Sequence, residues 1–150
     1  MVRDSERQKT YEAEWEVRAL LSRRGTIEMF GTQVAIPDER KFGTVEAVQA
    51  YVDAVMEHLG KDREVTVRKR KSADRAHYER LGSGIAGPDH EWALREMVIL
   101  HELAHHFTSV DVPSHGQEFR KNFCDLAEKV LAPEARVLLQ VAFGERGLKV

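Results

Sequence analysis

Hydrophobic residues recur along much of the chain at the three- and four-residue spacing that places side chains on one face of an α-helix. The clearest pattern covers residues 44–59, which carry Val45, Val48, Val52, Val55 and Leu59. Gly60 follows as an expected stop. On this basis we expect helices over residues 4–24, 44–59, 90–107, 114–131 and 133–144.

Three of these helices have a serine or threonine at or next to their start that can cap them. Thr44 can accept a hydrogen bond from the first turn of the helix that follows it. Ser5 with Gln8, and Ser114 with Gln117, have the spacing of a capping box. We therefore expect the hydroxyl groups of these residues to cap their helices.

The first helix has the weakest pattern. Tyr11, Trp15 and Ala19 form one stripe, and further apolar residues join it only toward the end. A narrow apolar stripe buries little surface. We therefore expect residues 4–24 to pack at the periphery of the domain.

Alternation of apolar and polar residues predicts short strands. Residues 26–36 carry β-formers around a glycine, which indicates a hairpin or two short strands. Residues 64–70 and 75–80 alternate on either side of a turn and predict an antiparallel pair. Residues 82–88 are expected to form a loop that holds a short edge strand at Ile85. Strands and helices are segregated along the chain, which predicts an α+β domain.

The composition is that of an ordinary globular protein. The chain has 150 residues, of which 42% are hydrophobic and 32% charged, and its net charge is −2. This length favours one domain over residues 1–150, and this charge gives no overall attraction for nucleic acid. No apolar run approaches the length needed to span a membrane, and the charged N-terminus is unlike a secretory signal, so we expect a cytoplasmic protein.

Cys124 is the only cysteine. A single cysteine excludes an internal disulfide and any zinc site built on several cysteines. Because Cys124 falls among the apolar residues of the helix expected over 114–131, we expect a small buried side chain.

Four of the seven histidines lie between positions 101 and 115, and two belong to an H-E-x-x-H sequence that runs from His101 to His105. Within the helix expected over 90–107, capped by Asp89, side chains four residues apart share a face, so both imidazoles can bind one metal ion. Zn²⁺ suits two neutral imidazoles and a third nitrogen or oxygen ligand, with one position left for water. Glu102 lies beside that position, where it can accept a proton from the water.

The third ligand has three candidates. His115 is the first, because nine residues separate it from His105 and an extended, proline-containing segment lets the chain reverse. Asp111, six residues past His105, and Glu118, one turn after His115, are the alternatives. His106 points about 100° away from His105 around the helix. It is therefore expected at the surface, or in contact with a metal ligand without binding the metal itself.

The sequence HELAHHF followed by PSHGQEF resembles the SprT-like branch of the zincin metallopeptidases, whose pattern is H-E-x-x-H, a variable loop and H-G-x-x-[F/W]. The match covers about residues 94–123. The resemblance implies a zincin-like α+β fold, with a small antiparallel or mixed sheet packed against the active-site helix and further helices at the C-terminus. It also implies one Zn²⁺ held by His101, His105 and His115, with Glu102 as general base. The chain is also similar to small H-E-x-x-H metallohydrolases of actinobacteria and their phages.

Two departures limit what the resemblance transfers. A single cysteine excludes the C-terminal zinc ribbon common among SprT-like proteins, so a DNA-linked substrate is not implied. In the metzincin pattern, Asp111 would fill the last ligand position, but Thr108 replaces the glycine that permits the sharp turn.

Substrate contacts are expected on the strands. By resemblance, residues 84–87 are the candidate edge strand that pairs with an extended peptide. His77 and Tyr78 fall on a strand expected beside the metal helix, where either could donate a hydrogen bond to an oxyanion; a packed tyrosine and an exposed histidine are the alternative.

The sequence thus predicts a zinc-dependent metallohydrolase, in the first place a metallopeptidase acting on a peptide or protein. The alternatives are a non-catalytic zinc-binding or sensor domain, a protease that cleaves one partner repressor, and a DNA-associated protease. The last would use the basic residues 68–71 with Arg75 and Arg80, which give residues 61–80 eight positive and four negative charges. A solvated strand edge explains the same charges.

Overall fold

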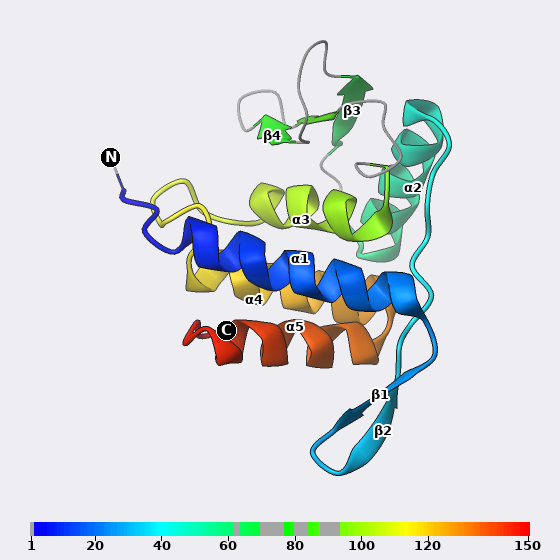
Figure 1. Ribbon diagram of the computed structural model, residues 1–150. Coiled ribbons are helices and arrows are strands. Elements are labelled where there is room, and N and C mark those ends of the chain that lie inside the picture. Colours follow the sequence, from blue (N-terminus) through cyan, green and yellow to red (C-terminus); the bar gives the residue numbers. More distant parts are fainter. Residues whose placement is uncertain (1, 62–63, 70–76, 80–83, 88–93) are drawn as a thin grey trace. The chain divides into compact units, whose positions relative to one another are not determined.

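The computed structural model describes residues 2–61, 64–69, 77–79, 84–87 and 94–150 and has a mixed α+β fold (Figure 1). The chain forms two compact units. The first comprises Met1–Glu39 and Phe107–Val150, and the second comprises Arg40–His106. The prediction of one domain over residues 1–150 stays a prediction.

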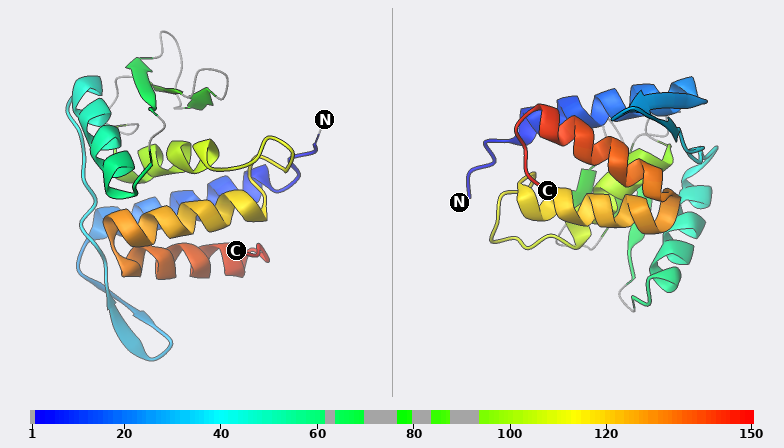
Figure 2. Two further views of the ribbon diagram at one scale, coloured as in Figure 1. Left: turned by 180° about the vertical axis from the view of Figure 1, so that it is seen from behind. Right: turned by 90° about the horizontal axis from the view of Figure 1, so that it is seen from below.

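The first unit is built on three helices: α1 (Arg7–Arg23), α4 (Gln117–Leu126) and α5 (Pro133–Glu145). They lie side by side, with α5 antiparallel to α1 and in contact with both neighbours (Figures 1 and 2). The stretch Ala127–Leu131 continues α4 as a π-helical turn, η1, so the helix expected over 114–131 changes its hydrogen-bond pattern in its last part. Helix α5 starts at Pro133, as predicted. Proline is tolerated in a first turn because the N–H group that it lacks would have no partner within the helix there.

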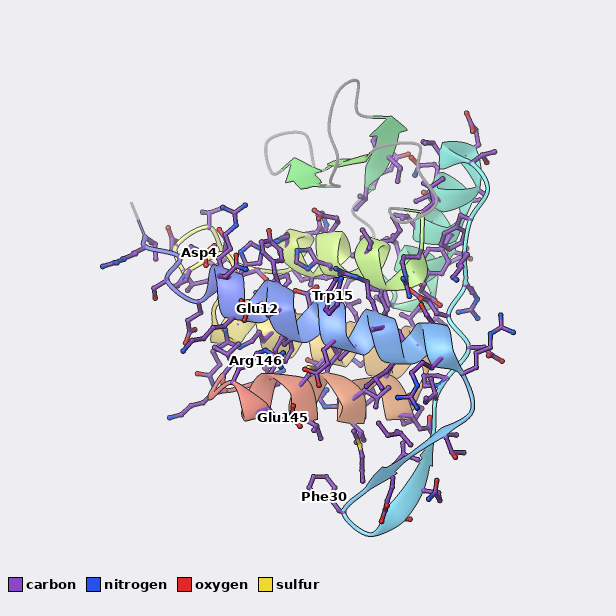
Figure 3. The ribbon with its side chains drawn as sticks, viewed as in Figure 1. Asp4, Glu12, Trp15, Phe30, Glu145 and Arg146 are labelled. Carbon is purple, nitrogen blue, oxygen red and sulfur yellow. The ribbon has the colours of Figure 1, made fainter. Side chains whose placement is uncertain are left out.

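One face of α1 is buried, although the helix was expected to be peripheral. Its buried residues are Thr10, Ala13, Glu14, Val17 and Leu21. The stripe predicted through Trp15 is wrong, because 68% of the Trp15 surface is exposed and its side chain projects from the helix (Figure 3). Two small or medium residues, Ala13 and Val17, let the helix approach its neighbours closely.

Both expected capping boxes of the first unit are wrong. The N-cap of α1 is Glu6, whose carbonyl accepts from the Thr10 N–H at 3.0 Å, and no side chain caps the helix. The N-cap of α4 is Gly116, also without a side-chain cap. The Gly116 N–H donates to the Pro113 carbonyl at 3.2 Å, so a turn precedes the helix and moves its start past Ser114.

The hairpin predicted within residues 26–36 is confirmed. Strands β1 (Thr26–Met29) and β2 (Thr32–Ala35) pair antiparallel. The two residues between them, Phe30 and Gly31, both have positive φ angles, of 51° and 75°. This two-residue turn matches the twist of the strands, which is why Gly31 suits it.

The second unit begins with α2 (Val45–His58), which agrees with the prediction. The Thr44 hydroxyl accepts from the Ala47 N–H at 3.1 Å, as expected of an N-cap. Gly60, just past the helix, has a φ of 68°, a conformation that favours glycine. Buried valines on one face of α2 provide part of this unit's core.

Among the described residues of this unit, three short strands form a sheet: β3 (Thr66–Lys69), β4 (His77–Glu79) and β5 (Gly84–Gly87). Their order is β3-β5-β4, with β5 parallel to β3 and antiparallel to β4. The direct antiparallel pairing predicted for residues 64–70 with 75–80 is therefore wrong, because β5 lies between them. β5 is central, so it is not the free edge expected to pair with a peptide.

Helix α3 (Glu96–His106) carries the H-E-x-x-H sequence. Two backbone hydrogen bonds hold the start of α3 and the residues just ahead of it: Glu96 N–H to Arg40 O at 2.9 Å, and Phe42 N–H to Leu94 O at 2.7 Å. Strand β4 packs against α3, and β3 packs against α2. The expected cap Asp89 and the expected start of the helix at residue 90 lie outside the described residues. Among the helices that the structure describes, none is long and apolar enough to cross a membrane.

Candidate metal-binding histidines

His101 and His105 face each other on α3, as their four-residue spacing predicts. Their Nε2 atoms are 3.2 Å apart. The rings meet edge to face, with centroids 4.9 Å apart and planes inclined by 73°. Both residues are buried, with 6% and 8% of their surfaces exposed. The helix therefore brings two imidazole nitrogens together away from bulk water.

The separation of these nitrogens fits a shared metal ion. Two nitrogens bound to one tetrahedral Zn²⁺ at about 2.0–2.1 Å lie about 3.3–3.4 Å apart. The 3.2 Å between the Nε2 atoms of His101 and His105 is close to this value. The same distance also permits an N–H···N hydrogen bond between the rings. Whether the protein binds metal distinguishes a shared ion from such a hydrogen bond.

Glu102 lies next to this pair. Its Oε1 is 3.9 Å from Nε2 of His101, and 4% of its surface is exposed. A carboxylate at this distance is too far for a strong direct hydrogen bond to the ring but near enough for one small molecule to contact both. This is the location that a general base acting on a water molecule beside His101 requires.

His115 belongs to the first unit, where it precedes α4. Its Nδ1 is 2.7 Å from Oδ2 of Asp4, and its backbone N–H donates to Oδ1 of the same carboxylate at 3.0 Å. Its ring contacts the aromatic rings of Tyr11 and Phe119, with centroids at 4.9 and 5.1 Å. The ring is buried, with 7% of the side chain exposed. These contacts fix its orientation and engage Nδ1.

The carbonyl of His115 is held as firmly as its ring. It accepts a hydrogen bond from the Thr10 hydroxyl at 3.2 Å and another from Nη1 of Arg120 at 2.8 Å. Arg120 is buried and donates also to Glu6 at 3.1 Å and to the Lys149 carbonyl at 2.7 Å. Residues from both ends of the chain thus position this histidine.

The alternative third ligands have other surroundings. Asp111 is exposed, and its backbone N–H donates to the Ser109 hydroxyl at 3.1 Å. Glu118 is half-buried and accepts from the Ser109 N–H at 3.4 Å. Both residues are more exposed to solvent than His115. The hydrogen bond from Ser109 links the Glu118 carboxylate to the loop ahead of α4. His106 is half-buried at the end of α3.

The side chains named for substrate contact lie outside the described part of the structure. This holds for His77 and Tyr78, whose backbone forms part of β4, and for the basic residues 68–71 with Arg75 and Arg80. Cys124 is buried, as predicted, and burial raises the pKa of its thiol to about 12. A thiol with such a pKa is a packing residue, because the thiolate is the reactive form.

Three residues that support these elements were not predicted from the sequence. Asp4 and Arg120 contact His115, and Glu96 holds the start of α3. Asp4 is separated from His115 by 111 positions, so no local spacing relates them. For Glu96, an acidic residue in the first turn of a strongly apolar helix was a usable signal, because such a buried carboxylate needs partners.

Comparison with protein-family models, with curated proteins and with solved structures finds no match for this chain.

Proposed function

We propose that this protein is a zinc-dependent metallohydrolase, specifically a zincin-like metallopeptidase. The observation that carries the proposal is the pair of buried imidazole nitrogens, His101 Nε2 and His105 Nε2, 3.2 Å apart and next to the buried carboxylate of Glu102. Two histidines and an adjacent acid on one helix are the donor set and the base that hydrolysis assisted by Zn²⁺ needs.

His115 is the proposed third ligand. Because its Nδ1 contacts Asp4, we assign Nε2 as the nitrogen that would bind the ion. Nine residues separate it from His105 along the chain, a short connection. The resemblance to SprT-like proteins, whose H-G pair follows the H-E-x-x-H helix, supports the same assignment.

The residues would divide the reaction as follows. The three imidazoles would hold the ion, which would supply Lewis-acid polarisation of a carbonyl and a lowered pKa of water. Glu102 takes a proton from the attacking water and delivers it to the leaving amine. Burial of Glu102 keeps bulk water from competing for that proton.

Metal content and hydrolysis, measured on the same samples, test the proposal. The substrates are unfolded casein and a fluorogenic quenched-peptide library. Glu102→Gln is expected to retain about one zinc per chain and to lose at least about 100-fold in rate, because only the base is removed. His101→Ala is expected to lose both zinc and activity.

Each other outcome points to a different function. A wild type that binds zinc but hydrolyses no substrate would favour a non-catalytic zinc-binding domain. Glu102→Gln should then bind zinc as the wild type does and also show no hydrolysis. Hydrolysis at the parental rate by Glu102→Gln would contradict the proposed base. Absence of zinc from the wild type, after reconstitution, would mean that the two rings share a hydrogen bond and not an ion.

A further inference from the structure

We infer that Asp4 is a positioning residue that presents His115 to the metal ion; the inference rests on the proposed function. A histidine that binds a metal through one ring nitrogen commonly donates the N–H of the other to a carboxylate, which fixes the tautomer and the direction of the ring. Asp4 lies in the segment just ahead of α1 (Figure 3) and occupies that place for His115.

The carboxylate of Asp4 makes two bonds to the same residue. Oδ2 is 2.7 Å from Nδ1 of the ring, and Oδ1 accepts the backbone N–H at 3.0 Å. An ionised carboxylate has acceptors only, so Nδ1 must carry the proton of that hydrogen bond. In the neutral ring the lone pair then resides on Nε2, which is the form that a metal ligand needs.

The two bonds also fix orientation. Because one oxygen holds the backbone and the other the ring, Asp4 restricts rotation about the side-chain bonds of His115. The buried Arg120 and the Thr10 hydroxyl donate hydrogen bonds to the His115 carbonyl. The ring is thus aligned before any ion binds, which lowers the entropy lost on binding.

The two bonds to His115 require a side chain with two acceptor oxygens, as the Asp4 carboxylate has. In Asp4→Asn, one oxygen becomes an NH₂ donor, so the side chain can accept from the backbone or from the ring but not from both. In Asp4→Ala, both bonds are lost. In Asp4→Glu, two acceptors remain on a longer side chain, so partial restoration is expected.

The first measurement needs no metal. Nitrogen-15 NMR of the imidazoles in zinc-free protein, at alkaline pH where a free imidazole is neutral, reports which ring nitrogen of His115 is protonated. The wild type is expected to show Nδ1–H, and Asp4→Ala a mixture with Nε2–H. Equal spectra for the two proteins would overturn the inference.

The second measurement is zinc affinity, by competition with a chromophoric chelator. Asp4→Asn and Asp4→Ala are expected to bind zinc about 10- to 100-fold more weakly, and Asp4→Glu to fall between them and the wild type. Glu12→Ala is the matched control: Glu12 is an exposed acid on α1 that contacts Gln8 at 3.3 Å (Figure 3). Its affinity is expected to equal that of the wild type.

The outcomes separate this inference from the proposed function. If wild type and Asp4→Ala bind zinc equally well, the role of Asp4 is wrong while zinc binding stands. If the wild type binds no zinc, both the proposed function and the role of Asp4 in zinc binding are wrong. Urea denaturation of each variant verifies that it is folded under the conditions of the titration, so that weakened binding cannot reflect unfolding.

Discussion

The Glu96 carboxylate accepts hydrogen bonds from both the backbone N–H and the guanidinium of Arg40, at 3.0 and 2.8 Å. The Tyr51 hydroxyl donates to the same carboxylate. Glu96 is fully buried, whereas 58% of the Arg40 side chain is exposed. One acid at the start of α3 therefore ties this helix to the segment ahead of α2 and to α2 itself.

We expect Glu96→Ala to destabilise the second unit by about 2–4 kcal/mol. The exposed ion pair contributes little to this figure. Most of it comes from the Arg40 N–H and the Tyr51 hydroxyl, which would lose the acceptor that Glu96 provides. Urea denaturation, followed by the loss of helical circular dichroism, measures the change.

The matched control for this experiment is Glu57→Ala, which removes an exposed acid from α2. Its effect on the free energy of unfolding is expected to stay within about 0.5 kcal/mol. If Glu96→Ala and Glu57→Ala unfold at the same urea concentration, Glu96 does not anchor the helix.

Glu14 makes stability depend on pH. Burial raises the pKa of its carboxyl from 4.5 to about 8, although electrostatic interactions with Arg18 and His115 act to lower it. Between these values the folded protein keeps a proton that the unfolded chain has lost. The free energy of unfolding should therefore fall as pH rises from about 5 to about 8, by roughly 1.4 kcal/mol per pH unit from this group.

Glu14→Gln should remove that contribution, because an amide does not ionise. In the presence of a chelator, the variant is expected to gain stability over the wild type progressively as pH rises, with little difference near pH 4.5. Glu12→Gln, exposed on the same helix, should follow the wild type. A constant difference between Glu14→Gln and the wild type across this range would contradict the proposed protonation of Glu14.

Features set by neighbours along the chain could be predicted from the sequence. The bounds of α2 follow from its valine spacing, the Thr44 cap and the positive φ of Gly60. The facing of His101 and His105 follows in the same way from helical geometry, which relates residues four apart.

Features set by distant contacts could not. The position of β5 between β3 and β4 depends on which strand edges meet. Its sequence, GIAG, has one large side chain among three small residues and carries no alternation that would indicate this position. The bonds between Asp4 and His115 join residues 111 positions apart. Nor does a pattern show that the carbonyl of Glu6, and not the hydroxyl of Ser5, begins the hydrogen bonding of α1.

Zinc itself should stabilise the protein if His101, His105 and His115 hold one ion. Binding to the folded state alone adds about 2.7 kcal/mol to the free energy of unfolding when free zinc is about 100 times its Kd. Thermal denaturation with and without chelator measures this gain. Because the proposed ligands lie in α3 and in the segment ahead of α4, the proposal predicts that hydrogen exchange slows in both on adding zinc. In His115→Ala, the slowing ahead of α4 should disappear, and its persistence there would exclude His115 as a ligand.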